Sequence, residues 1–157
     1  MATPAERRAA LQTSIEQFVA GVEALPEEQF LQEAGGRTPR DIVAHLIGWN
    51  YYAIEASEPI GRGEVPPSLI DPGPDFSRVN GESMVRYAAR DRGELLGQLR
   101  ESAAAYDAML RGLPDAEWDD NHGVVRGDWS VTNGSFVEIM IGEFDHHRQE
   151  VASWPAP

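Results

Sequence analysis

The sequence comprises 157 residues with 13 basic and 26 acidic side chains, so its formal net charge at pH 7 is −13. A charge of this sign and size repels nucleic acid and anionic membranes, and we expect neither as a partner. The chain contains no cysteine and no lysine, which excludes disulfide bonds, thiolate nucleophiles and Schiff-base chemistry. Its length is that of one domain, spanning residues 1–157. The polar N-terminus lacks the apolar core of a signal peptide, and no segment is apolar enough to span a membrane, so we expect a cytoplasmic protein.

Four segments have apolar residues at the spacing of amphipathic helices, and a shorter helical piece precedes the third. The first two begin with threonine followed by proline, Thr3-Pro4 and Thr38-Pro39, which is typical of a helix start. Asp41 completes a near capping box in the second. No segment has the alternating pattern of a sustained strand. The helices are predicted at residues 3–25, 38–57, 92–113 and 133–154, with the shorter piece at 82–90.

Two long connections separate these helices. Residues 59–79 contain five prolines, and residues 115–130 are acidic and include two tryptophans. Connections of this length are either lids over a binding site or simply mobile segments, and both alternatives stand. As lids, both should cross the bundle at the end where the site opens. Four helices joined by two long crossover loops predict an all-α four-helix bundle, of up-down-down-up topology or a close relative of it.

The segment 142–150 contains the strongest candidate for a functional site. Glu143 and His147 are four residues apart, so on a helix they project from the same face and can bind one divalent ion. Apolar residues on or beside that face direct it toward the interior, where a carboxylate and an imidazole are costly unless paired or bound to metal. Taken alone, His45 in the second helix is typical of a hydrogen-bonded core residue. It is nevertheless the natural third ligand, because bundles build metal sites from facing helices.

Two motifs resemble those of a known family. Residues 38–46 with Trp49 resemble the second-helix signature of the DinB-like (YfiT-like) four-helix-bundle superfamily. Residues 143–149 are similar to its fourth-helix motif but lack the glycine of that motif. The sequence 76–80, after the proline-rich connection, is similar to the branch that contains the colibactin self-protection protein.

The resemblance implies a bundle that holds a divalent metal ion through three side chains, one on the second helix and two on the fourth. On this chain the three positions are His45, Glu143 and His147, and Glu143 stands where most members have histidine. Two histidines and one glutamate suit zinc with an open coordination position, and nickel, iron and manganese are also open. The alternative is that the glutamate marks a branch that has lost the metal.

The resemblance also implies a function. Members of the superfamily include transferases and isomerases in which the metal activates a low-molecular-weight thiol cofactor. The leading hypothesis is therefore a metal-dependent small-molecule enzyme, either a thiol-dependent transferase or isomerase or a hydrolase, acting in detoxification or stress response. A second hypothesis is a metal-independent self-protection hydrolase or binding protein for a reactive natural product, in which Glu143 acts as acid or base with a raised pKa. A third is a non-catalytic ligand- or metal-binding module.

Further side chains are candidates for roles around the ion. His146 is predicted to flank the site, because it points about 100° away from His147 on the helix. Asp145 and Glu150 are candidates to orient a ligating histidine through hydrogen bonds. The oligomeric state is open, a homodimer included. The candidates to line a substrate pocket are Trp49, Tyr52, Asn80 and Trp129. The candidates to bind an anionic substrate are Arg40, Arg78, Arg126 and Arg148.

Overall fold

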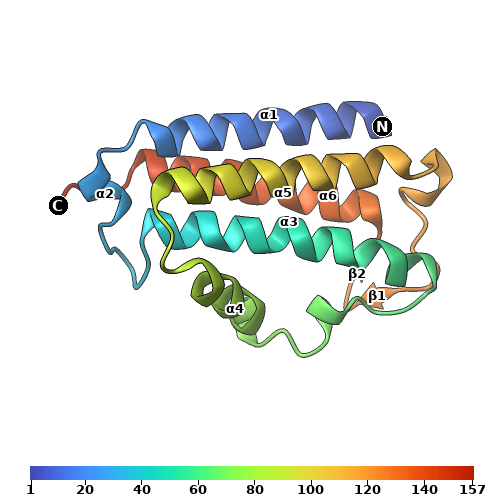
Figure 1. The fold of residues 1–157 in the computed structure, drawn as a ribbon. Coiled ribbons are helices and arrows are strands. Elements are labelled where there is room, and N and C mark those ends of the chain that lie inside the picture. Colours follow the sequence, from blue (N-terminus) through green and yellow to red (C-terminus); the bar gives the residue numbers. More distant parts are fainter.

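Four long helices form the body of the molecule in a computed structural model that describes all 157 residues (Figure 1). Helices α1 and α6 run in one direction and α3 and α5 in the other, with α1 packed on α6 and α3 packed on both α5 and α6. The order is therefore up-down-down-up, and the predicted all-α four-helix bundle is confirmed. The long helices are α1 (Pro4–Glu23), α3 (Pro39–Gly61), α5 (Arg92–Gly112) and α6 (Asn133–Ala152).

Each long helix begins at a capping box. The caps are Thr3, Thr38, Asp91 and Thr132, and each side chain accepts a hydrogen bond from the backbone N–H three residues later. A cap of this kind stabilises a helix by about 1 kcal/mol, so each of the four helices has a local signal at its start. The inner faces of the helices meet in one continuous hydrophobic core, in which Phe18 of α1 packs edge-on against Phe144 of α6.

Short elements occupy the connections. They are α2 (Glu27–Phe30), η1 (Pro67–Leu69), η2 (Pro74–Phe76), α4 (Ser77–Tyr87), η3 (Asp115–Glu117), β1 (Val125–Arg126) and β2 (Trp129–Ser130). The two strands pair as a small antiparallel hairpin. None of the helices has the length and apolar character needed to cross a lipid bilayer.

Two helix boundaries differ from those expected by a full turn or more. Helix α3 continues to Gly61, beyond the predicted end at residue 57 and through Pro59. Ala56 and Ile60 are both fully buried, so the apolar face continues for another turn and its packing outweighs the proline. Helix α4 begins at Ser77 rather than at residue 82, because its first turn already packs on α3.

Glycine at position 48 allows α4 to lie close to α3. A Cβ atom placed on Gly48 would lie 1.9 Å from the Oγ atom of Ser83 on α4. No side chain fits in that space, so the two helices can approach this closely only at a glycine. This contact places Asn80, one turn before Ser83, beside the face of α3 that carries His45.

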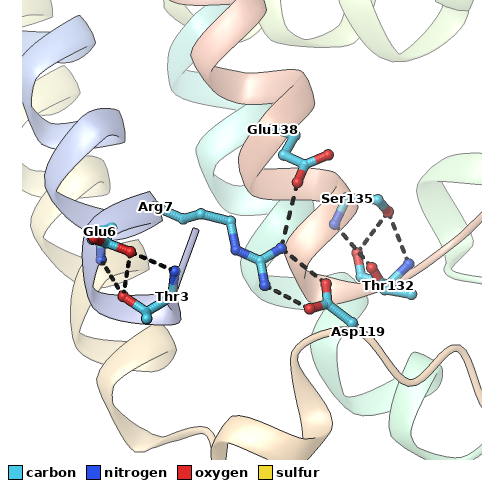
Figure 2. Close-up of polar contacts among 7 residues, drawn as sticks. All are labelled: Thr3, Glu6, Arg7, Asp119, Thr132, Ser135 and Glu138. Carbon is cyan, nitrogen blue, oxygen red and sulfur yellow. Dashed lines mark hydrogen bonds and ion pairs between the residues drawn. The ribbon is translucent and has the colours of Figure 1, made fainter. Parts of the chain in front are cut away.

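Arg7 of α1 fixes the second long connection to the bundle (Figure 2). Its guanidinium group donates to both carboxylate oxygens of Asp119, at 2.9 and 2.6 Å, and lies 3.5 Å from Glu138 of α6. The same group lies over the ring of the buried Trp118, whose carbonyl oxygen accepts from Gly134 N–H at 2.7 Å. The connection is thus attached to both α1 and α6 before the hairpin and α6 itself begin.

Candidate metal centre

Three side chains from α3 and α6 converge on one point. The Nε2 atom of His45 lies 3.2 Å from Oε2 of Glu143, and the Nε2 atom of His147 lies 3.5 Å from the same oxygen. The three candidate ligand atoms all lie within 4.8 Å of one another. Zinc bonds to nitrogen and oxygen of about 2.0–2.2 Å place neighbouring ligands at separations of this order. The spacing is therefore compatible with a shared ion.

Hydrogen bonds on the far side of each imidazole fix its orientation. Nδ1 of His45 donates to Oδ1 of Asn80 at 2.9 Å, and the same oxygen accepts from Nε1 of Trp49 at 2.8 Å. Because an amide oxygen can only accept, the proton of a neutral His45 ring lies on Nδ1. The Nε2 lone pair of His45 is thus left facing Glu143.

His147 is held in the same way by a carboxylate. Its Nδ1 atom donates to Oε2 of Glu150 at 2.7 Å, and Arg37 pairs with the other oxygen of Glu150. Burial raises the pKa of Glu150, but the hydrogen bonds from His147 and Arg37 lower it overall, so this carboxylate is ionised. His147 itself is 4% exposed, which leaves its ring little freedom to turn.

Three electron-pair donors therefore face one another. The imidazole nitrogens can donate to Glu143 only as imidazolium ions, because each Nδ1 already carries a proton used elsewhere. The cluster thus requires positive charge, either from protonated rings or from a bound cation. When the rings are protonated, hydrogen bonds from His147 and then His45 hold the pKa of Glu143 far below its usual value. The raised pKa expected under the metal-independent hypothesis is not found, because imidazoles rather than apolar groups surround this carboxylate.

The cluster lies in the wall of a cavity of about 420 Å³ that opens between α3 and α6. Of the four residues expected around the ion, Trp49, Asn80 and Trp129 line this cavity. Tyr52 does not line it, and the expectation for this residue is corrected. Its hydroxyl group donates to the carbonyl oxygen of Val79 at 3.2 Å, because α4 packs over that side of α3.

Further residues line the cavity wall. His146, which is predicted to flank the site, lines the cavity, and the centroid of its ring lies 5.1 Å from that of His147. Phe136 and Ile139 precede Glu143 at helical spacing, a signal that was present in the sequence. Among the four arginine candidates for anion binding, Arg126 alone lines the cavity. The other unexpected lining residues are Arg37, Asp75 and Phe76.

The two long connections reach the cavity differently from the expectation. Both depart from the end of the bundle where α3 ends and α6 begins (Figure 1). His45 lies near the start of α3 and His147 near the end of α6, toward the other end of the bundle. The cavity opens along the side of the bundle rather than at an end. The first connection contributes Asp75 and Phe76 to its wall, and the hairpin of the second contributes Arg126 and Trp129.

The fold and the site together define a four-helix bundle with a histidine–glutamate–histidine cluster on facing helices. The chain belongs to the DinB superfamily, whose family model matches residues 9–151. The resemblance found in the sequence motifs is thereby confirmed. No curated protein matches the chain significantly in sequence.

Solved structures share the fold across nearly the whole chain. A protein from Streptococcus pneumoniae has a TM-score of 0.80 at 19% identity, covering 98% of this chain and 91% of its own. The sibling lethal factor precursor DfsB has a TM-score of 0.79 at 15% identity, covering 98% and 95%. The colibactin self-resistance protein ClbS, in complex with a double-stranded DNA, has a TM-score of 0.79 at 12% identity, covering 98% and 96%. Identities this low establish the fold alone.

The ClbS complex corrects one expectation. We expected no nucleic acid as a partner from the net charge of −13. A protein of the same fold is nevertheless seen in complex with a double-stranded DNA, so this exclusion is wrong. Net charge is a sum over the whole surface, and salt screens exposed charges beyond about 8–10 Å, so it does not determine what a local surface can bind.

Proposed function

We propose that this protein is a divalent-metal-dependent enzyme that acts on a small molecule in the cavity between α3 and α6. One observation carries the proposal: two Nε2 lone pairs and one carboxylate oxygen converge, while both Nδ1 protons are used by Asn80 and Glu150. His45, Glu143 and His147 would hold the ion. Zinc suits this set of two nitrogens and one oxygen, and nickel is the alternative. A bound ion of this kind acts as a Lewis acid and lowers the pKa of a coordinated water or thiol.

The other residues of the cavity orient the metal ligands and bind the substrate. Asn80 and Glu150 keep the two imidazole rings in the tautomer that presents Nε2 to the site. The aromatic rings of Trp49, Phe76 and Phe136 line the cavity, so it can bind an apolar substrate and exclude water from the reacting group. Because the chain has no cysteine, a thiol nucleophile must come from outside, as a low-molecular-weight cofactor. We propose a thiol-dependent transfer or isomerisation, or a hydrolysis, in detoxification or stress response.

Metal analysis of protein purified without chelator tests the metal site. The native chain should contain one ion, His147→Ala should lose it, and Glu143→His should retain it, because imidazole replaces the carboxylate as ligand. His122→Ala is the matched control. His122 lies in the second connection and pairs with Glu117 at 2.8 Å, away from the cavity, so this variant should keep the ion. Equal metal content in all four proteins, or none in the native chain, would contradict the proposal.

The likeness to the colibactin self-resistance protein supports a second candidate. In this alternative the cavity binds or hydrolyses a reactive natural product without metal. If the cavity binds a ligand and catalyses no reaction, the protein is a non-catalytic binding module. Turnover or binding of an electrophilic test compound that survives complete removal of metal by chelator would favour this candidate. Loss of that activity on chelation and its return with zinc would favour the metal-dependent enzyme.

A further inference from the structure

The cavity has a second end, remote from the metal ligands. Phe136 precedes Glu143 by seven residues, so it lies about 10 Å along α6 from the ligand cluster. Trp129 of the hairpin packs against Phe136, with ring centroids 5.4 Å apart, and is anchored by a hydrogen bond from its Nε1 to Ser135. Arg126 is the strand partner of Trp129, and paired residues lie on the same face of a hairpin. The hairpin therefore presents a guanidinium group at this end of the cavity.

Strained backbone places an aromatic ring between the two ends. Asp75 and Phe76 both have left-handed backbone conformations, with φ values of 50° and 58°. Such conformations cost about 1–3 kcal/mol each in residues other than glycine, and they persist where surrounding contacts hold them. Here the ring of Phe76 packs edge-on against Trp49 at 5.4 Å and lies 4.8 Å beneath the guanidinium carbon of Arg126.

The charge of Arg126 is not neutralised within the protein. Most arginines of this chain pair with a carboxylate, including Arg37 of the same cavity, which pairs with Glu150. Arg126 forms no ion pair, and it alone among the unpaired arginines lines the cavity. The carboxylates in the cavity wall, Asp75 and Glu143, do not pair with it. In a chain with 26 acidic residues, a pocket arginine left free is available to an anion from solution.

We propose that Arg126, over Phe76 and beside Trp129, is an anion-binding site that selects the substrate. The substrate class is an elongated molecule with a reacting group at one end, an apolar or aromatic middle, and a carboxylate or similar oxyanion about 10 Å away. The identity of the reacting end rests on the proposed function. The anion site rests on the geometry of the hairpin and η2.

Calorimetric titration with two matched probes tests the site. The zinc-loaded protein is titrated with 4-(mercaptomethyl)benzoate and with 4-(mercaptomethyl)benzamide, which share a thiol and a ring and differ in charge at the far end. The native chain should bind the carboxylate about tenfold more tightly. Arg126→Gln should reduce this preference to less than about twofold, and Arg126→Lys should keep part of it. None of these variants should change zinc affinity.

Arg86→Gln is the matched control. Arg86 also has no ion pair and lies over an aromatic ring, that of Tyr87, but it is outside the cavity. Its replacement changes the net charge of the chain by the same amount and should preserve the full preference. The anion site would be overturned, even if zinc binds, by any of three results. The native chain shows no preference for the carboxylate probe, Arg126→Gln retains that preference, or Arg86→Gln loses it to the same extent.

The two proposals fail in different ways. Benzoate and benzamide, which lack the thiol, are titrated into chelator-treated protein. An Arg126-dependent preference for benzoate, in a chain that binds no zinc, would refute the proposed function and support the anion site. The opposite result is also possible: zinc binding depends on His147, but neither pair of probes shows a preference that depends on Arg126. That result would support the metal site and refute the anion site.

Discussion

Replacing Asp119 with asparagine should destabilise the protein far more than its partly exposed position suggests. The change keeps the shape of the side chain and removes its charge. In the native protein the carboxylate accepts two hydrogen bonds from Arg7, whose side chain is only 8% exposed (Figure 2). In the variant the amide oxygen can still accept one hydrogen bond from Arg7, but an NH2 group replaces the second acceptor, and the one carboxylate left beside Arg7 is that of Glu138 at 3.5 Å. A buried guanidinium group would thus lose most of the charge that compensates its desolvation.

The size of the stability loss follows from the burial of Arg7 and the exposure of Asp119. Hydrogen bonds to charged groups contribute about 1.5–3 kcal/mol. Asp119 is 51% exposed, so solvent screens its charge and lowers the expected loss to about 1–2 kcal/mol. For a chain of this size, the melting temperature should fall by about 3–6 °C. Thermal unfolding followed by circular dichroism measures the difference.

The same pair predicts a pH dependence. The hydrogen bonds from Arg7 hold the pKa of Asp119 below its usual value, and burial opposes this only in part. Because the pKa is lowered in the folded state, the stabilisation is complete above the unfolded-state pKa of about 3.9. It is lost as the pH falls through the lower pKa of the folded state. The difference in melting temperature between the native chain and Asp119→Asn should therefore be full at pH 7 and shrink below about pH 4.

Glu23→Gln provides the matched control. Glu23 is 51% exposed, like Asp119, but its partner Arg100 is 55% exposed. Pairs between two exposed side chains contribute about 0–1 kcal/mol, so this variant should lower the melting temperature by no more than about 3 °C. Equal shifts in the two variants would refute the reasoning, because the two pairs differ chiefly in the burial of the arginine.

The remaining predictions concern the cavity. Glu150→Gln should weaken zinc binding by about 10–100-fold, because the amide no longer stabilises the Nδ1–H form of His147. Competition with a chromophoric chelator measures this. Asp145, the other candidate to orient a histidine, forms no hydrogen bond with His45 or His147, so Asp145→Asn should have no effect. Phe76→Gly should leave stability within about 1 kcal/mol, because relief of the left-handed strain offsets the lost packing. It should nevertheless weaken binding of 4-(mercaptomethyl)benzoate severalfold in calorimetry, and unchanged binding would remove Phe76 from the site.

The bundle itself could be predicted from sequence because its signals are local. Threonine caps followed by proline fixed two helix starts, and apolar spacing identified all four long helices. The ligand cluster was accessible for a related reason. Glu143 and His147 lie one turn apart, so their proximity requires only that the segment be helical. Pairing them with His45 required a further assumption, that α3 and α6 face each other, which the bundle supplies.

The wall of the cavity could not be predicted in this way. Trp49 and Tyr52 are three residues apart and were assigned to one pocket, but α4 covers Tyr52 and leaves Trp49 in the cavity. Which of the two is covered depends on the close approach at Gly48, a tertiary contact. Phe76 reaches the cavity because its backbone is left-handed, and Arg126 reaches it because it lies in a hairpin. Neither of these features produces a periodic pattern in the sequence.

The two parts of the site depend on different parts of the fold. The candidate ligands lie on α3 and α6, which are long, capped and buried against each other, so their positions depend on the stability of the whole bundle. The anion site lies on the connections, and the second of these is attached to α1 and α6 by Arg7 and Asp119. Loss of that attachment should release the hairpin that carries Arg126 while leaving the bundle intact. Asp119→Asn should therefore retain zinc and lose part of the preference for carboxylate over amide probes. Variation in the connections can thus change what this bundle selects without changing what its helices bind.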